Sequence, residues 1–211
     1  MLKVNEIYKS IQGESSFVGL PCVFIRLTGC PLRCVWCDTA YAFEEGKEMT
    51  VSEVVQSAKS LGLSLVELTG GEPLSQKDAF PLVKSLLGHG CQVLVETSGA
   101  VLVTELDPRA VKIMDIKCPG SGMMETMLWE NLNHLTGQDE LKFVIKDKND
   151  FDWSCSIIEK HRLQDRKILF SPVFGELEPK LLSSWILEKN IAVRMQLQIH
   201  KYIWDPDARG V

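Results

Sequence analysis

The sequence predicts an α/β fold: an incomplete (partial) TIM-type barrel of about six parallel strands, open at one side, with helices outside. Short runs rich in β-branched residues alternate along the chain with segments of helical spacing or charge, an order that builds a mostly parallel sheet. Several runs end in polar or glycine-rich clusters, where parallel α/β folds bind ligands. Six or so strands in 211 residues are too few for a closed eight-stranded barrel.

Each element follows from its local pattern, since β-branched runs favour strands and spaced apolar or charged residues favour helices. In chain order we expect a strand at 23–29 and a helix at 51–61; a strand at 63–70 and a helix at 77–87; strands at 91–99 and 111–117 and a helix at 125–134; a strand at 141–146 and a helix at 150–160; a strand at 167–172, a helix at 178–188 and a last strand at 194–200. No repeat, low-complexity tract or linker interrupts this order, so residues 1–211 are expected to form a single domain.

Composition narrows the function classes. The net charge of -5 argues against a generic nucleic-acid binder, which usually carries clustered Lys and Arg. No stretch approaches the roughly 18 apolar residues that span a bilayer, and the start lacks the apolar segment of a secretory signal. We therefore expect a soluble, cytoplasmic protein whose partners are small molecules, and whose seven cysteines are metal ligands or core residues rather than disulfides.

Three cysteines carry the strongest signal. Cys30, Cys34 and Cys37 lie in a loop directly after the predicted strand 23–29, and a compact loop of this kind brings its thiols to one soft metal centre. A 4Fe-4S cluster held by three thiolates keeps one iron free for another ligand. Structural zinc is the alternative, but it normally needs a fourth ligand, and Cys22 is separated from the loop by a strand. The other cysteines, Cys22, Cys91, Cys118 and Cys155, lack ligand spacing, so one cluster is expected.

The C-x3-C-x2-C pattern, with Trp36 before its last cysteine, resembles the signature of the radical S-adenosylmethionine (SAM) superfamily. The segments 69–73 (TGGEP) and 115–117 (DIK), at the ends of predicted strands, extend the resemblance, which implies that the chain binds SAM. An ammonium needs acceptors and a carboxylate needs a cation, roles that suit Glu72 and Lys117. Without the resemblance, TGGEP reads as a tight turn and Lys117 as a surface charge. The implied SAM-binding residues are Trp36, Gly71, Glu72, Ser98, Asp115 and Lys117.

Further segments resemble the 7-carboxy-7-deazaguanine synthase family in the same order over nearly the whole chain. They lie at 4–15, 37–39, 96–99, 115–122, 142–145, 170–173 and 196–201. The resemblance implies ring contraction of 6-carboxy-5,6,7,8-tetrahydropterin to 7-carboxy-7-deazaguanine with loss of ammonia, in queuosine or 7-deazapurine biosynthesis. It also implies that SAM is reformed, that Mg2+ binds at Thr39, and that the substrate contacts Gln12, Gly13, Glu14, Arg26, Thr69 and His200.

The residue types fit these roles, although each has a structural alternative. Glu14 can accept from pterin N–H groups or hold a turn, and Arg26 can meet substrate charge or a structural carboxylate. Thr39 offers Mg2+ a hydroxyl oxygen but could also cap a turn. The alternation in 194–200 aims His200 into the barrel, where it contacts substrate or is a core histidine. The C-terminal segment 204–211 departs from the family pattern, and no role is assigned to Val211.

The resemblance also implies a homodimer, and a reductant protein such as a flavodoxin is the usual electron donor. No direct contact with nucleic acid or membrane is expected. The main alternative is a small radical SAM activase acting on a protein partner, which the segment Gln12-Gly13-Glu14 and the Gln198-x-His200-Lys201 ending argue against. A non-catalytic iron-sulfur or zinc-binding module is the alternative from another class, and it would not cleave SAM.

Overall fold

The computed structural model describes residues 1–211 and contains one nine-stranded sheet. Its strands lie in the order β3-β1-β2-β4-β5-β6-β7-β8-β9. The strands are β1 (Leu2–Ile11), β2 (Pro21–Leu27), β3 (Lys47–Met49), β4 (Leu65–Gly70), β5 (Gln92–Thr97), β6 (Val111–Ile116), β7 (Glu140–Ile145), β8 (Lys167–Pro172) and β9 (Arg194–Met195). The helices are α1 (Val51–Ser60), α2 (Ala79–Gly88), α3 (Lys148–Lys160), α4 (Pro179–Lys189) and α5 (His200–Ile203).

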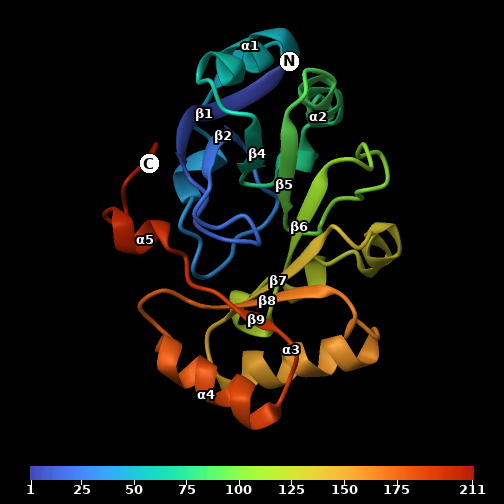
Figure 1. Ribbon diagram of the computed structural model, residues 1–211, viewed down its shortest axis with the longest axis vertical. Helices are drawn as coiled ribbons and strands as arrows, with labels where there is room; N and C mark the ends of the chain where they lie inside the picture. Colours follow the sequence, from blue (N-terminus) through green and yellow to red (C-terminus); the bar gives the residue numbers. More distant parts are fainter.

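From β2 to β9 every neighbouring pair of strands is parallel, whereas β1 pairs antiparallel with both β2 and β3. The strands follow an arc that does not close, and the C-terminal segment with α5 lies at its open side (Figure 1). This architecture confirms the expected α/β class and the open, partial barrel. The two edge strands, β3 and β9, are the shortest, which limits the unpaired backbone that the sheet exposes.

Helices α1 to α4 lie along the outside of the arc (Figure 1). Thr50 caps the start of helix α1, and its side chain and that of Glu53 form a reciprocal capping box. Its buried residues Val54, Val55 and Ala58 join the main apolar core, a cluster of 37 buried residues that also includes side chains of the central strands. The outer face of the sheet therefore holds the core, and its inner face is free for a site.

The inner face of the sheet has two layers. At the amino ends of the strands, a small apolar cluster closes the interior: Cys22, Phe24, Leu65, Leu94, Val111 and Ile113. Successive inward side chains on a strand are two residues apart, so the next positions form a second layer. We call it the inner polar layer, and its members are Arg26, Glu67, Glu96, Asp115 and Lys142.

Two expected elements differ from the structure, and two strands of the structure were not expected. The helix predicted at 125–134 is replaced by two short 3-10 turns, at Met124–Thr126 and Trp129–His134. The side chain of Asn131 there donates to the carbonyls of Gly99 and Val101 and accepts from the N–H of Val103, which fixes the turns against the loop after β5. The strand predicted at 194–200 ends at Met195, and β1 and β3 were not expected.

The chain leaves the sheet after Met195 because its next main-chain partner lies elsewhere. The N–H of Ile199 donates to the carbonyl of Gly13 at 3.0 Å, and His200 then begins α5. The expected alternation therefore does not place His200, although its imidazole still lines the barrel interior. His200 therefore points into the barrel because the chain turns at Ile199, and not because it lies on the inner face of a strand.

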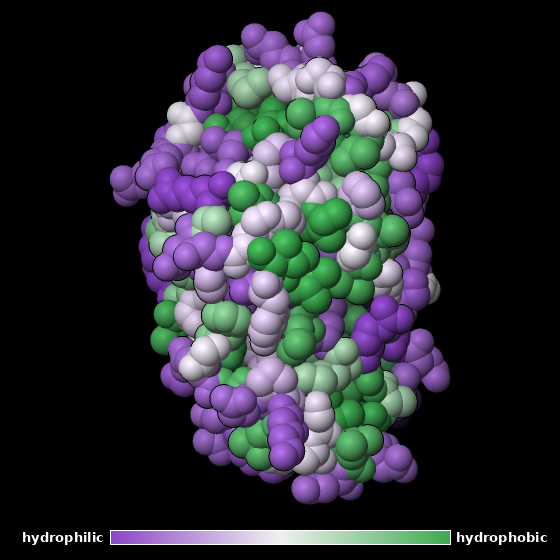
Figure 2. All heavy atoms as spheres, turned by 60° about the vertical axis from the view of Figure 1, so that its left-hand side comes forward, coloured by the Kyte–Doolittle hydropathy of each residue, from purple (hydrophilic) through white to green (hydrophobic).

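Hydrophobic side chains gather across the middle of one face of the molecule, bordered by hydrophilic ones (Figure 2). Among the large apolar residues that are exposed in the structure are Val18, Leu20, Tyr202 and Ile203. Helices long and apolar enough to cross a membrane are absent from the structure.

Candidate active site

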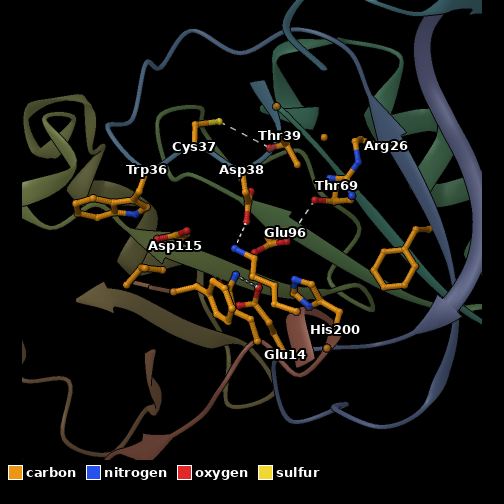
Figure 3. Close-up of a pocket in the computed structure, with 18 of the residues that line it drawn as sticks. Glu14, Arg26, Trp36, Cys37, Asp38, Thr39, Thr69, Glu96, Asp115 and His200 are labelled. Carbon is orange, nitrogen blue, oxygen red and sulfur yellow. Dashed lines mark hydrogen bonds and ion pairs between the residues drawn. The ribbon is translucent and has the colours of Figure 1, made fainter. Parts of the chain in front are cut away.

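A cavity of about 720 Å³ occupies the interior of the arc. The loop that carries the three cysteines, residues 29–39, lies on one side of it, and the inner polar layer forms its floor (Figure 3). The last residues of the chain, from Asp205 to Val211, also line it. All predicted site residues except Glu72 line this one cavity, which is where ligands bind in parallel α/β folds.

The cysteine loop is held by close backbone packing against the end of β4. A Cβ on Gly71 would lie 2.4 Å from the carbonyl oxygen of Gly29 and 2.6 Å from Cβ of Cys30, so only glycine fits there. The N–H of Glu72 donates to the same Gly29 carbonyl at 2.9 Å. The glycine pair after β4 thus serves to bring the cysteine loop close to the strand ends.

The donor set of the loop fits a cluster with one open iron. Cys30, Cys34 and Cys37 all line the cavity as free thiols, and the four remaining cysteines do not reach it. No group of three or more His, Cys, Asp or Glu side chains converges closely enough to hold a single metal ion. Thiolates that bind a 4Fe-4S cluster attach to different irons and need not converge on one point, so the loop suits a cluster better than zinc.

Glu72 lies behind the cavity wall. It is fully buried, and its carboxylate accepts hydrogen bonds from the Thr97 hydroxyl and from the N–H of Ser98 at 2.6 Å. The hydroxyl of Ser98 and the N–H of Leu74 also donate to it. Burial raises the pKa of Glu72, and these hydrogen bonds act against that rise. Glu72 thus ties β4 to the end of β5, and its partners Thr97 and Ser98 both line the cavity.

Asp115, near the end of β6, and Lys117, just after it, form an ion pair of 2.9 Å between Oδ2 and Nζ. Figure 3 shows Asp115 beside Trp36 of the cysteine loop. Burial would lower the pKa of Lys117, but the charge of Asp115 and that of the nearby Cys34 thiolate raise it overall. Lys117 is therefore a permanent cation beside the cysteine loop. Only 17 % of its side chain is exposed, so the alternative that it is a solvated surface charge is wrong.

Lys142 lies at the centre of the inner polar layer. Its Nζ is 3.0 Å from Oε2 of Glu14, within ion-pair distance of Glu96, and 3.7 Å from Oδ2 of Asp115. Burial would lower the pKa of Lys142, but these three carboxylates raise it well above its ordinary value. One ammonium therefore links the region around Asp115 to the region around Glu14.

The segment after β1 enters the barrel from its amino end. The amide of Gln12 donates to Glu67 and accepts from the N–H of Glu14 at 2.7 Å, and Gln198 donates to Glu14 at 2.8 Å. Burial would raise the pKa of Glu14, but the charges of Lys142 and His200 and its hydrogen bonds lower it overall. Glu14 is thus a carboxylate fixed at the floor of the cavity (Figure 3).

Gly13 and His200, which come from opposite ends of the chain, are in direct contact. A Cβ on Gly13 would lie 2.1 Å from Nδ1 of His200, so the ring packs directly on the glycine backbone. Burial lowers the pKa of His200, with the charge of Glu14 acting against it. The imidazole is therefore neutral near pH 7 and can both donate and accept a hydrogen bond.

The remaining predicted residues lie on the same side of the cavity as Thr39 (Figure 3). Arg26 pairs with Glu6 at 2.7 Å and donates to the hydroxyl of Tyr8, so the structural ion pair is present while the guanidinium still lines the cavity. Oγ1 of Thr39 lies 3.9 Å from Sγ of Cys37, and Thr69 donates to Glu96 at 3.3 Å. Asp38, which Lys201 of α5 contacts at 2.7 Å, connects the cysteine loop to the C-terminal segment.

Sequence reasoning missed Glu67, Glu96 and Lys142 as site residues. Each is a charged residue inside a strand that is mainly apolar, and charged residues are rarely placed in such strands unless they serve a site or a pair. That signal was present in Leu65–Gly70, Gln92–Thr97 and Glu140–Ile145. Val211, to which no role was assigned, lines the cavity.

Comparison with known proteins agrees with this geometry. Residues 24–168 match the family model of the radical SAM superfamily. The chain is 46% identical to the 7-carboxy-7-deazaguanine synthase of Chlorobaculum tepidum over 100% of its own length and 97% of that protein. It is 41% identical to the synthase of the same name from Koribacter versatilis, over the full length of both. The crystal structure of QueE from Escherichia coli superimposes with a TM-score of 0.76, at 24% identity, over 92% of this chain and 93% of that one, which shows the same fold.

Proposed function

This chain belongs to the radical SAM superfamily and, within it, to the 7-carboxy-7-deazaguanine synthases, and we propose how its cavity serves that reaction. The substrate is 6-carboxy-5,6,7,8-tetrahydropterin, and the product is 7-carboxy-7-deazaguanine, formed by ring contraction with loss of ammonia. One observation carries the proposal: the three cluster thiols and the inner polar layer face each other across one cavity large enough for two ligands.

When bound, the 4Fe-4S cluster and SAM would supply the radical chemistry that starts the reaction. Cys30, Cys34 and Cys37 hold the cluster. Lys117 pairs with the carboxylate of SAM, and Asp115, Ser98 and Trp36 line the same half of the cavity. Glu72 acts from behind the wall, since its hydrogen bonds fix Ser98 while the backbone at Gly71 remains open to the cavity.

The floor of the cavity holds the pterin. The carboxylate of Glu14, fixed by Lys142 and Gln198, accepts from pyrimidine N–H groups. The neutral His200, resting on Gly13, donates or accepts at the rim, and Arg26 and Thr69 face substrate oxygens from β2 and β4. Gln12 lines the cavity and holds the main chain of Glu14, and its amide keeps a second N–H for the substrate.

Thr39 supplies a hydroxyl oxygen for Mg2+. Hard cations prefer oxygen ligands and keep several waters, so one side chain and the substrate carboxylate suffice as further ligands. Asp38 stands next to Thr39 in sequence and is held by Lys201, which suits a residue that orients the bound water.

We also propose the setting of the enzyme. Residues 1–211 form a single domain, and all seven cysteines are free thiols, which suits the reducing cytoplasm. The exposed apolar side chains, among them Val18, Leu20, Tyr202 and Ile203, support a homodimer. A flavodoxin-like protein reduces the cluster.

An anaerobic assay tests the proposed function. The iron-reconstituted, reduced protein is incubated with SAM, Mg2+ and the tetrahydropterin, and deazapurine is followed by mass and absorbance. We expect product from the wild type and from Cys91→Ala, whose thiol does not line the cavity, and none from Cys34→Ala. Equal product from all three proteins, or none from the wild type, would contradict the proposal.

A further inference from the structure

One acidic residue of the inner polar layer has no cation. Glu14, Glu96 and Asp115 each lie within 4 Å of Nζ of Lys142, and Asp115 also pairs with Lys117. Glu67 forms no ion pair, although it is 3% exposed and lines the same cavity. A buried carboxyl group without a cation is costly in its charged form.

The contacts of Glu67 run through a single side chain. Its Oε2 accepts a hydrogen bond from Nε2 of Gln12, and its Oε1 forms no hydrogen bond in the protein. Oε1 of Gln12 in turn accepts from the main-chain N–H of Glu14 at 2.7 Å. Gln12 is also 3% exposed, so its amide has little freedom to find other partners. These bonds form a chain from Glu67 through Gln12 to the backbone of Glu14.

The charges around Glu67 favour its protonated form. Burial raises the pKa of Glu67 well above its ordinary value, and the nearby carboxylates of Glu96 and Glu14 raise it further. The positive charges of Lys142 and Arg26 act in the other direction but do not reverse the shift. A neutral carboxyl group keeps an acceptor oxygen for the Gln12 amide without placing a third negative charge beside Glu14 and Glu96.

We infer that Glu67 is a positioning residue for the substrate half of the cavity, which fixes Gln12 through a hydrogen bond and, through Gln12, the backbone that carries Glu14. The inference rests on the proposed function, since it assigns the pterin to Glu14. Lys142 and Gln198 hold the carboxylate of Glu14 from one side, and the chain from Glu67 holds its main chain from the other. No hydrogen bond or ion pair joins the side chain of Glu67 to the SAM-binding residues Ser98 and Lys117, so its effect should be confined to the pterin.

Two variants separate hydrogen bonding from charge. Glu67→Gln keeps an acceptor for the Gln12 amide and is always neutral, whereas Glu67→Leu keeps the approximate volume and removes the acceptor. The probe is 6-carboxypterin, the oxidised and unreactive form of the substrate, whose fluorescence reports binding to the cluster-loaded protein in the presence of SAM. The dissociation constant of SAM, measured separately, and the thermal unfolding of each variant serve as controls for the fold.

We expect Glu67→Gln to bind the pterin within about threefold of the wild type, and Glu67→Leu to bind it about tenfold or more weakly, because the Gln12 amide loses its partner. The affinity for SAM should be unchanged in both. In turnover, Glu67→Leu should raise KM for the tetrahydropterin more than it lowers kcat. Rescue by Glu67→Gln is the result that a required negative charge would not give.

Equal weakening by Glu67→Gln and Glu67→Leu would overturn the inference, since it would show that the charge is needed. Wild-type affinity in Glu67→Leu would also overturn it, because the chain to Glu14 would then have no role. If the wild type itself bound no pterin and formed no deazapurine, the proposed function would fail instead. The two failures are therefore distinguishable.

Discussion

At the scale of single residues, Lys142 decides whether the inner polar layer is stable. Its side chain is 4% exposed and stands between Glu14, Glu96 and Asp115, which come from three different parts of the chain. A buried ion pair contributes little compared with an apolar pair, but removing one partner leaves a buried charge unpaired. Because one ammonium stands among three carboxylates, losing that ammonium should destabilise the protein more than losing any one of the carboxylates.

Lys142→Met should therefore lower the free energy of unfolding at pH 7 by about 3–5 kcal/mol. Lys146→Met is the matched control: Lys146 lies one position beyond the end of β7 and pairs only with Glu176 at the surface, at 3.2 Å. That pair should contribute at most about 1 kcal/mol. Urea unfolding of both variants measures the difference, and equal stability of the two would contradict the role given to Lys142.

The protonation of Glu67 gives a pH dependence with a definite sign. In the unfolded chain this carboxyl ionises near its ordinary pKa, whereas burial keeps it protonated in the folded protein to a higher pH. The folded state thus binds one more proton in that window, and wild-type stability should fall by about 1.4 kcal/mol per pH unit from this group. This destabilising contribution of Glu67 is absent below the ordinary pKa of a glutamate and grows as the pH rises above it.

Glu67→Gln lacks this proton, so its stability relative to the wild type should rise between pH 5 and pH 7. The shifts of Glu14, Glu72 and Asp115 act in both proteins and cancel in the comparison. Denaturant unfolding at several pH values measures it. A stability difference that stayed constant over this range would mean that Glu67 is ionised in the folded protein.

Gly13 sets the position of His200. Gly13→Ala places a methyl group within van der Waals overlap of the imidazole, which must move, and we expect about tenfold or greater loss of activity with about 1–3 kcal/mol of destabilisation. Gly88→Ala is the control, since a Cβ there meets nothing within 4 Å. Activity in Gly13→Ala equal to that in Gly88→Ala would show that His200 does not serve the reaction.

At the scale of elements, the sequence pattern predicted the strands whose formation depends on their own residues. The β-branched runs become β2 and β4 to β8, because a buried parallel strand is nearly uniformly apolar. It failed where contacts with distant parts of the chain decide the local structure. Asn131 holds Trp129–His134 as a 3-10 turn through three bonds to the loop after β5, and Gly13 draws Ile199 out of the sheet. Neither contact has a signal in its own segment.

Helix caps give an element-scale prediction that is independent of the site. Thr50→Ala removes the capping box of α1 and should cost about 1 kcal/mol of stability without changing activity. Glu178→Ala is the control, because Glu178 precedes α4 without any hydrogen bond from its side chain to the helix. Thermal unfolding compares the two. A loss of activity in Thr50→Ala at unchanged stability would contradict the separation of outer helices from the cavity.

At the scale of the whole molecule, motifs predicted the cysteine loop and most cavity residues, while the topology explains why they meet. Because β2, β4, β5 and β6 are parallel, their carboxyl ends lie at the same end of the sheet. Segments far apart in the chain therefore share a cavity (Figure 1). The antiparallel β1 brings Gln12, Gly13 and Glu14 in from the opposite end. The family resemblance predicted Gln12, Gly13 and Glu14 as site residues. The sequence pattern did not predict β1, so it could not explain how these residues reach the cavity.

The central claim is that this cavity carries out a ring contraction in which SAM is reformed. The most direct measurement is the ratio of deazapurine formed to SAM consumed by the reduced enzyme. We predict many molecules of product for each SAM lost, with little loss of SAM when the pterin is omitted. Consumption of SAM without deazapurine, as expected of an activase that acts on a protein partner, would contradict the account.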